Sequence, residues 1–381
     1  MKRNTNYIIR DKSLLSNKKN LETLHKFKDF PVFMGCVEQP QDEDIVSDMI
    51  WDICPETGLI QLQKLLPLDI LYLDQHNDGV GKVWQDHYVA FAKFISKFNP
   101  KRVLEIGGAH DHIARNLWTV IPDVEWTTVE PNAQYITNPK IKLIKGWFDD
   151  KFKLDEGIDT IVHSHVFEHT YEPFKFLKQI NSFLKRGDKH IFTFPNMIPM
   201  LDKKFTNCLN FEHTVFLTEE ITDYILQSMG FKILEKEYYG DPHSIFYATE
   251  KTDVVEDVST LPNKYIQYKK LFMDYINYHK EMIDDLNMKI GSSNEPVYLF
   301  GAHIFSQTLI QFGLKVDKIV GLLDNSQVKN KKRLYGTKLM VEHPKILKGK
   351  GKVNVIIKAG IYNEEIKRDI LENINSEVIF W

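Results

Sequence analysis

Two glycines follow an apolar run that contains a carboxylate, and this is the strongest chemical signal in the chain. The run reads Val-Leu-Glu-Ile over residues 103–106 and leads directly into Gly107 and Gly108. Paired glycines let the backbone turn tightly after a strand and let a ligand lie against the main chain. A dinucleotide site would add a third glycine in the pattern GxGxxG, but this stretch contains His110 and His112 instead. The pattern favours a ligand-binding turn of another kind, with an ordinary strand–turn–helix unit as the alternative.

The acidic residue within this run indicates which ligand the turn would hold. Glu105 lies on the predicted strand itself, just before the glycines. An acidic residue at this point is typical of Rossmann-like methyltransferases, in which it helps to position the amino-acid end of S-adenosylmethionine (SAM). The ammonium group of SAM favours a nearby carboxylate. We therefore expect Glu105, Gly107 and Gly108 to bind SAM.

A second carboxylate stands 22 residues after Gly108, where the apolar stretch 126–130 ends. Glu130 is followed by Pro131 and a turn. A carboxylate at the end of the second strand can accept hydrogen bonds from both ribose hydroxyls. Glu130 and Pro131 are therefore expected cofactor contacts, and a surface glutamate at a strand end is the alternative.

Two later strand ends complete the expected cofactor site. Trp147, Phe148 and Asp149 follow the third predicted strand, where methyltransferases hold the adenine between an aromatic wall and a polar group. An aromatic edge of the core is the alternative for this trio. Ser164 and His165 end the fourth predicted strand, and the carboxyl end of a parallel strand is where ligands of this fold bind.

Three loop segments carry histidines on the expected acceptor side. His169, His213 and His243 each follow a predicted strand, and an imidazole can accept a proton near neutral pH. Such a base could deprotonate a hydroxyl or a carbon next to a carbonyl, and Glu212 could bind substrate or orient His213. Solvated or structural histidines are the alternative. A metal site is a further one, but the sequence shows no third ligand at a suitable spacing, so no metal is expected.

Strands and helices alternate from residue 85 to about 251, which predicts an α/β domain with a largely parallel sheet. Before residue 84 no clear pattern is visible apart from a strand-like run at 58–66. Residues 252–290 carry an apolar stripe at helical spacing and predict a long amphipathic helix. From 291 to 381 a smaller strand–turn–helix pattern predicts a Rossmann-like C-terminal domain.

Composition excludes several other classes of protein. The chain has 381 residues, enough for two or three domains, and a formal net charge of −3, which argues against a nucleic-acid binder. No apolar run approaches the roughly 18 residues that a membrane span needs. The N-terminus is polar and the three cysteines form no CxxC pair, so we expect a cytoplasmic protein without disulfides.

Several motifs together resemble the three-domain sugar methyltransferases, the C-methyltransferase family that acts on nucleotide-linked deoxysugars. The resemblance begins near residue 30 and runs to the C-terminus. It rests on these stretches of the sequence: CPETGLIQL at 54–62, VLEIGG at 103–108, VFEHTYEP at 166–173, FEHTVFLT at 211–218, LLDNSQVKNKKRLYGTKLMV at 322–341 and IYNEEI at 361–366.

The resemblance implies a fold, a cofactor, a substrate and catalytic residues. The implied architecture is a Rossmann-like class I methyltransferase domain (85–251) between a small N-terminal domain (1–84) and, after a helical linker (252–290), a C-terminal Rossmann-like domain (291–381). SAM would be the cofactor, and a nucleotide-linked sugar would lie in the cleft of a monomer or homodimer. The family's catalytic glutamate and histidine match Glu212 and His213, and a further family histidine matches His169. The substrate would also meet four residues: His76, Asn77, His243 and Tyr362.

Two departures from the family leave the reaction open. The family binds structural zinc through two CxxC pairs, but here only Cys36 and Cys54 remain, too few for a tetrahedral site. The stretch 72–78, often rich in tyrosine in the family, reads YLDQHND. Oxygen methylation is therefore as plausible as carbon methylation. A nucleotide-sugar-binding protein with a decayed SAM site, a small-molecule O- or N-methyltransferase and an NAD-dependent enzyme are the competing interpretations.

Overall fold

The computed structural model describes residues 7–72, 81–132, 136–252, 261 and 263–381. The chain forms two compact units. The first unit comprises Met1–Asn77, Pro199–Glu212 and Lys264–Trp381, and the second comprises Asp78–Ile198 and His213–Asn263. The N- and C-terminal parts of the chain therefore belong to one unit, and the expected methyltransferase domain makes up most of the other.

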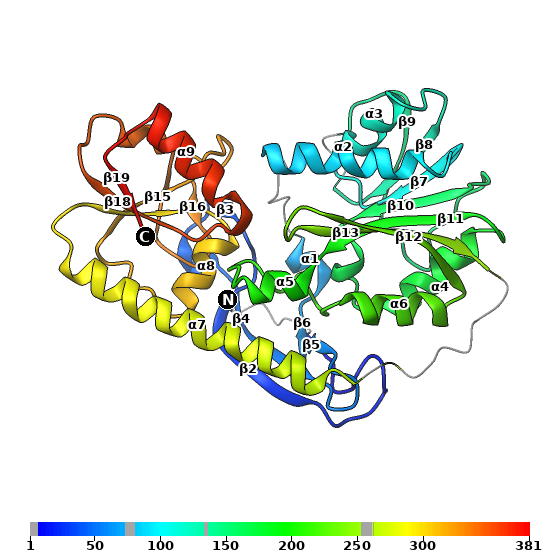
Figure 1. Cartoon of the computed structure of the whole chain (residues 1–381), viewed down its shortest axis with the longest axis horizontal. Helices are drawn as coiled ribbons and strands as arrows, with labels where there is room; N and C mark the ends of the chain where they lie inside the picture. Colours follow the sequence, from blue (N-terminus) through cyan, green and yellow to red (C-terminus); the bar gives the residue numbers. More distant parts are fainter. Residues whose placement is uncertain (1–6, 73–80, 133–135, 253–260, 262) are drawn as a thin grey trace. The chain divides into compact units, whose positions relative to one another are not determined.

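A seven-stranded sheet forms the centre of the second unit, in the order β12-β13-β11-β10-β7-β8-β9 (Figure 1). The strands are β7 (Arg102–Ile106), β8 (Glu125–Glu130), β9 (Ile141–Lys145), β10 (Thr160–Ser164), β11 (Lys189–Pro195), β12 (Phe231–Tyr239) and β13 (Ser244–Lys251). β13 runs antiparallel to both of its neighbours, and every other pair in the sheet is parallel. The strand order reverses between β7 and β10, so the loops after these two strands border a topological switch point.

Helices cover both faces of this sheet. Figure 1 shows α2 and α3 on one face and α4 and α6 on the other. Their bounds are α2 (Lys82–Ser96), α3 (His112–Trp118), α4 (Pro173–Phe183) and α6 (Glu219–Ser228); a 3-10 turn, η2 (Phe167–His169), precedes α4. α2 buries Phe91, Phe94 and Ile95 against the sheet, because these residues recur at helical spacing. The predicted alternation and the Rossmann-like α/β fold class are thereby confirmed.

A five-stranded parallel sheet, β17-β15-β14-β18-β19, is the larger sheet of the first unit. Its strands are β14 (Val297–Phe300), β15 (Ile319–Leu323), β17 (Val341–Glu342), β18 (Val353–Ile357) and β19 (Val378–Phe380). The helical elements of this part are α7 (Tyr265–Ser292), α8 (Ile304–Gln311), η3 (Pro344–Leu347), η4 (Gly360–Tyr362) and α9 (Asn363–Asn373). α7 confirms the predicted long helix, and its stripe is buried at Tyr268, Phe272 and Tyr275.

The N-terminal part of the first unit contains antiparallel strands, of which the sequence predicted only the run at 58–66, where β5 lies. β2 (Glu22–Pro31), β4 (Val46–Ile53) and β5 (Ile60–Leu62) form a three-stranded sheet. The pairing of β2 with β4 shifts register at two places, which breaks the two-residue alternation that marks a strand in a sequence. The remaining short elements are β1 (Ile8–Ile9), β3 (Cys36–Val37), η1 (Gln41–Glu43), β6 (Lys64–Leu65), α1 (Leu68–Leu71), β16 (Arg333–Leu334) and α5 (Met197–Asp202), which spans the division between the units.

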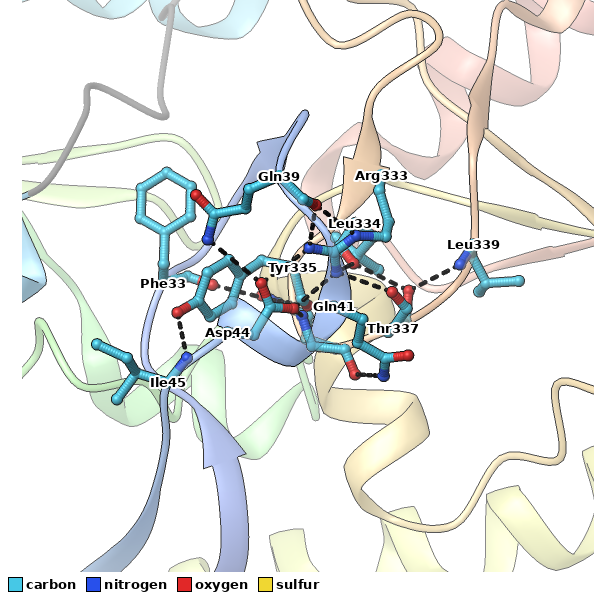
Figure 2. Close-up of polar contacts among 12 residues, drawn as sticks. Phe33, Gln39, Gln41, Asp44, Ile45, Arg333, Leu334, Tyr335, Thr337 and Leu339 are labelled. Atoms are coloured by element: carbon cyan, nitrogen blue, oxygen red, sulfur yellow. Dashed lines mark hydrogen bonds and ion pairs between the residues drawn. The ribbon is translucent and has the colours of Figure 1, made fainter. Parts of the chain in front are cut away.

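A buried ion pair joins the N- and C-terminal parts of the first unit (Figure 2). The guanidinium of Arg333 makes a bidentate contact with the carboxylate of Asp44, at 2.6 and 2.8 Å, and also donates to the carbonyls of Gln39 and Thr337. The side chains of Arg333 and Asp44 are 9% and 4% exposed. Gly336 has φ +83°, and a Cβ there would lie 2.4 Å from Cγ of Pro31. The C-terminal motif that carries the family resemblance therefore holds the N-terminal segment in place.

None of the helices in the described ranges combines the length and the apolarity that a membrane crossing needs.

Candidate active site

The glycine turn after β7 is closely packed by its neighbours. Gly107 has φ +75°, and a Cβ there would lie 2.6 Å from Cγ2 of Val166, the second residue after β10. The amide of Gly107 donates to the carbonyl of Val129 on β8, at 3.0 Å. Only glycine suits both the left-handed backbone and the close approach of the β10 loop. The turn lies at the switch point, where the sequence predicted a ligand.

Glu105 lies beneath this turn. Its carboxylate is 2% exposed, and its Oε2 accepts hydrogen bonds from Trp126 Nε1 at 2.9 Å and from Thr128 Oγ1 at 3.0 Å. Burial raises the pKa of Glu105 to about 7. A Cβ on Gly108 would lie 2.4 Å from the carboxyl carbon of Glu105, so the carboxylate supports the turn directly. Contact of Glu105, Gly107 and Gly108 with SAM stays a prediction.

Glu130 ends β8 at the same edge of the sheet. The residue is 8% exposed, and its Oε1 accepts a hydrogen bond from the backbone amide of Asn132 at 2.7 Å. Burial raises the pKa of this carboxyl group. Because the carboxylate folds back over Pro131, it fixes the turn that follows the strand. The ribose contact expected of Glu130 and Pro131 stays a prediction.

The three residues expected near adenine have different environments. Trp147 is 44% exposed, whereas Phe148 is half-buried. Phe148 packs against three further aromatic rings, those of Phe152, Phe176 and Phe183. Asp149 Oδ1 accepts a hydrogen bond from the amide of Lys151 at 3.0 Å, which stabilises its own turn. Phe148 therefore matches the alternative interpretation of an aromatic residue at the edge of the core. Trp147 is the more exposed of the two rings, so it is the better candidate for contact with adenine.

The residues after β10 adopt a strained conformation at the switch point. Ser164 ends the strand, and His165 follows with φ +54°, a left-handed backbone that is uncommon for a residue other than glycine. The Nε2 atom of His165 lies 3.0 Å from Ser244 Oγ, and its Nδ1 lies 3.4 Å from Glu168 Oε1. His165 therefore lies between the start of β13 and the 3-10 turn that carries Glu168.

Glu168, His169 and His213 come together in the second unit. One potential ligand or hydrogen-bonding atom from each residue lies within 4.8 Å of the other two. The rings of His169 and His213 are 5.3 Å apart, and His169 Nε2 lies 3.7 Å from Glu168 Oε1. The amide of Thr214 donates to the carbonyl of Glu168 at 3.1 Å, which fastens the two segments. We call these three residues the acid–histidine group.

The carboxylate of Glu168 is the unusual member of this group. It is 2% exposed, and among the described residues neither of its oxygens has a hydrogen bond of good geometry. Burial would raise its pKa, but the contact with His165 and the nearby His169 and His213 outweigh burial and lower it. Glu168 is therefore a buried negative charge, and the imidazoles of His165, His169 and His213 compensate it. Glu168 precedes His169 in the sequence, so it was, like Glu212, an adjacent glutamate that could bind substrate or orient a base; the sequence did not indicate that it is buried.

The remaining expected substrate residues are distributed over the chain. The division between the units falls between Glu212 and His213. Glu212 is 4% exposed in the first unit, and its amide donates to Asn210 Oδ1 at 2.9 Å. Tyr362 ends η4 in the first unit, and its ring lies 6.1 Å from that of Phe305. His76 and Asn77 lie outside the described residues.

His243 lies beside a histidine that the sequence did not indicate. The ring of His87, on α2, is 5.0 Å from that of His243 and 5.4 Å from that of His165. A histidine within an apolar helix carries no sequence signal of function, so only the fold reveals this neighbourhood. Among the described residues, the groups that could hold a metal ion are this one and the acid–histidine group, and neither contains Cys36 or Cys54.

Comparison with known proteins identifies one domain of the chain. Residues 80–236 match the family model described as a methyltransferase domain. No curated protein is similar enough in sequence to count as a relative. Solved structures that resemble part of the chain include a SAM-dependent methyltransferase of Thermotoga maritima, at 18% identity over 45% of this chain and 91% of that one, with a TM-score of 0.35. Human N-acetylserotonin methyltransferase in complex with SAM is another, at 14% identity over 45% and 53%, with a TM-score of 0.38.

The family match runs from α2 into β12 and includes the glycine turn, Glu130 and the residues of the acid–histidine group. It confirms the enzyme class that the sequence predicted. The chain therefore contains a methyltransferase domain, and SAM is the cofactor expected of it.

Proposed function

We propose that this methyltransferase transfers the methyl group of SAM to a sugar, most naturally a nucleotide-linked one, with His213 as the base. The acid–histidine group is the observation that supports the proposal. Two imidazoles and a buried carboxylate lie together in the second unit: Glu168 and His169 in the 3-10 turn after β10, and His213 in the loop before α6. The sequence motifs around His169 and His213 are those that resemble the sugar methyltransferases.

The proposed reaction needs one proton transfer and one methyl transfer. The acceptor gives a proton to the imidazole of His213, and its oxygen or carbon forms a bond to the methyl carbon of SAM. The bond between the methyl carbon and the sulfur of SAM breaks, its electron pair stays on sulfur, and S-adenosylhomocysteine leaves. Because SAM supplies an activated methyl group, the protein mainly aligns the acceptor and removes the proton.

Glu168 would favour this proton transfer. A buried carboxylate with a lowered pKa remains ionised at neutral pH, and it stabilises an imidazolium that forms nearby. His169 lies between Glu168 and the ring of His213, so it would share the positive charge. Glu212, His76, Asn77, His243 and Tyr362 are the further residues that we propose for holding the sugar or orienting the base.

Single-turnover methyl transfer from SAM to a panel of nucleotide-linked sugars tests the proposal. His213→Ala should lower the rate by about 100-fold or more, because a general base typically contributes that much. SAM affinity should stay unchanged. His343→Ala is the matched control, since His343 caps the short helix η3 in the first unit.

Two results would contradict the proposal in different ways. Near-normal turnover of the His213→Ala variant, with loss in a His169→Ala or His76→Ala variant, would move the base elsewhere. Binding of SAM without transfer to any sugar of the panel would reject the acceptor class.

A further inference from the structure

Three histidines from three separate elements meet within the second unit. His87 lies on α2, His165 follows β10, and His243 directly precedes β13. One ring nitrogen from each lies within 4.8 Å of the other two, and the ring centroids are 5.0–5.8 Å apart. We propose that this histidine cluster binds a divalent transition-metal ion, with zinc as the first candidate.

The donor set suits such an ion. Imidazole is a preferred ligand of zinc and of other late first-row metals, and three histidines with one open position make a common catalytic zinc site. His87 is completely buried, and among the described residues neither of its ring nitrogens has a hydrogen-bond partner. A metal ion bound to the unprotonated ring nitrogen would give that buried atom a partner, whereas simple packing of the ring does not.

The surroundings of His165 provide the outer contacts that metal sites require. A metal-bound histidine usually donates its second ring N–H to a carboxylate, which fixes the orientation of the ring. His165 Nδ1 lies 3.4 Å from Glu168 Oε1, and the other ring nitrogen, Nε2, lies 3.0 Å from Ser244 Oγ. Glu168 is the buried carboxylate that lacks a well-formed hydrogen bond among the described residues. Ligation through Nε2 would leave Nδ1–H to donate to Glu168, so one arrangement satisfies both groups.

The cluster lies where an ion could act on the acceptor, and this part of the inference rests on the proposed function. His165 is adjacent in sequence to Val166, which packs on Gly107 of the cofactor turn. The side chain of His165 is 17% exposed, so the cluster is open on that side. An acceptor oxygen at the fourth position would be polarised by the ion, which lowers the pKa of a hydroxyl. The ion would therefore favour methylation of a sugar oxygen over a carbon.

Metal content of the full-length protein tests the site independently of activity. After incubation with zinc and gel filtration, elemental analysis should find one zinc per chain, and cobalt substitution should give the visible spectrum of a low-coordinate site with nitrogen ligands. His165→Asn removes the ligand and keeps a residue that tolerates the left-handed backbone. His243→Ala removes a second ligand. Both variants should lose stoichiometric zinc, and Glu168→Gln should bind zinc 10- to 100-fold more weakly.

Control variants separate this site from the other candidate ligands. His169→Ala and Cys54→Ser should each retain one zinc. Loss of zinc in the first variant would place the ion in the acid–histidine group, and loss in the second would place it near the N-terminal cysteines; either result overturns the proposal. Absence of zinc and cobalt binding in the unmodified protein overturns it as well. The cluster is then a structural one, held by aromatic packing around Trp84 and Tyr239 and by the contacts of His165 and His243 with the hydroxyl of Ser244. Failure of sugar methylation with zinc retained would reject the proposed function but not the metal site.

Discussion

Gly108 lies directly above the carboxylate of Glu105, so closely that a Cβ on residue 108 would stand 2.4 Å from the carboxyl oxygen and carbon. The carboxylate cannot move away easily, because Trp126 and Thr128 hold its Oε2. Gly108→Ala should therefore displace the turn that we expect to hold SAM. We predict at least a 10-fold loss of SAM affinity by calorimetry and a loss of about 1–3 kcal/mol in the free energy of unfolding, as is usual for an overpacked site.

A matched glycine provides the control for this prediction. Gly81 precedes α2, has φ −63°, and has no atom within 4 Å of the position that a Cβ would take. Gly81→Ala should leave SAM affinity and stability nearly unchanged. If Gly108→Ala binds SAM as tightly as Gly81→Ala does, the glycine turn is not the cofactor contact.

Glu130 should hold the ribose of SAM. Two hydrogen bonds to a charged group are worth roughly 2–4 kcal/mol together, so Glu130→Ala should weaken SAM binding by about 30- to 1000-fold. The matched control is Glu125→Ala, at the exposed start of the same strand. Calorimetry that finds equal affinity in the two variants would refute the ribose assignment, and a lower melting temperature of Glu130→Ala alone would point to a role in fixing its own turn.

The sequence predicted the cofactor half of the fold well, because its signals are local. The glycine turn, the strand end at Glu130 and the alternation of strands and helices are each set by residues that are neighbours in the sequence. His169 and His213 were both expected on the acceptor side of the site, and in the structure the centroids of their rings are 5.3 Å apart. Their motifs lie in loops whose sequence resembles a known family, so the family pattern supplied the long-range information.

The parts that could not be predicted depend on long-range packing. His87 contacts His165 and His243 only because α2 packs against β13 on one face of the sheet, and no spacing in the sequence encodes that approach. The strands of the N-terminal part have bulges that hide their two-residue period. Arg333 was noted only as part of a family motif, since its partner Asp44 lies far away in the chain.

Buried histidines should make the fold sensitive to mild acid. The Nε2 atoms of His163 and His190 lie 2.8 Å apart within the sheet, and both residues are completely buried. Burial lowers the pKa of His190 to about 3 and that of His163 well below its usual value, so both stay neutral in the folded protein. In the unfolded chain they gain protons below about pH 6.5, and the free energy of unfolding therefore falls as the pH decreases from 6.5 toward 3.

Urea unfolding at pH 7.5 and pH 5.0 measures this effect. At pH 5.0, protonation of His190 in the unfolded chain by itself lowers the free energy of unfolding by about 2 kcal/mol. Protonation of His163 in the unfolded chain lowers it further. The double variant His163→Gln/His190→Gln keeps a buried hydrogen-bonding pair that does not titrate, so it should lose less stability between the two pH values. All other histidines are common to both proteins and cancel in the comparison. An equal pH dependence of the two proteins would show that this pair does not contribute.

The Arg333–Asp44 pair should be essential for the stability of the first unit. Removal of one partner of a buried ion pair leaves an uncompensated charge and costs about 3–5 kcal/mol, whereas an exposed pair contributes about 0–1 kcal/mol. Asp44→Asn should therefore lower the free energy of unfolding by about 3–5 kcal/mol. Asp274→Asn is the matched control, because Asp274 pairs with Lys270 on the exposed surface of α7 in the same unit.

A second variant distinguishes the lost charge balance from lost packing. In Asp44→Asn/Arg333→Met the buried cation is also removed, so no uncompensated buried charge remains, and that charge is the main cost of breaking a buried pair. The double variant should thus recover part of the stability that Asp44→Asn loses, as measured by urea unfolding at pH 7.5. The carbonyls of Gln39 and Thr337 lose their donor in that variant, so recovery should be incomplete. If Asp44→Asn is as stable as Asp274→Asn, the pair does not fasten the N-terminal segment, and the three-stranded sheet is held by its apolar contacts alone.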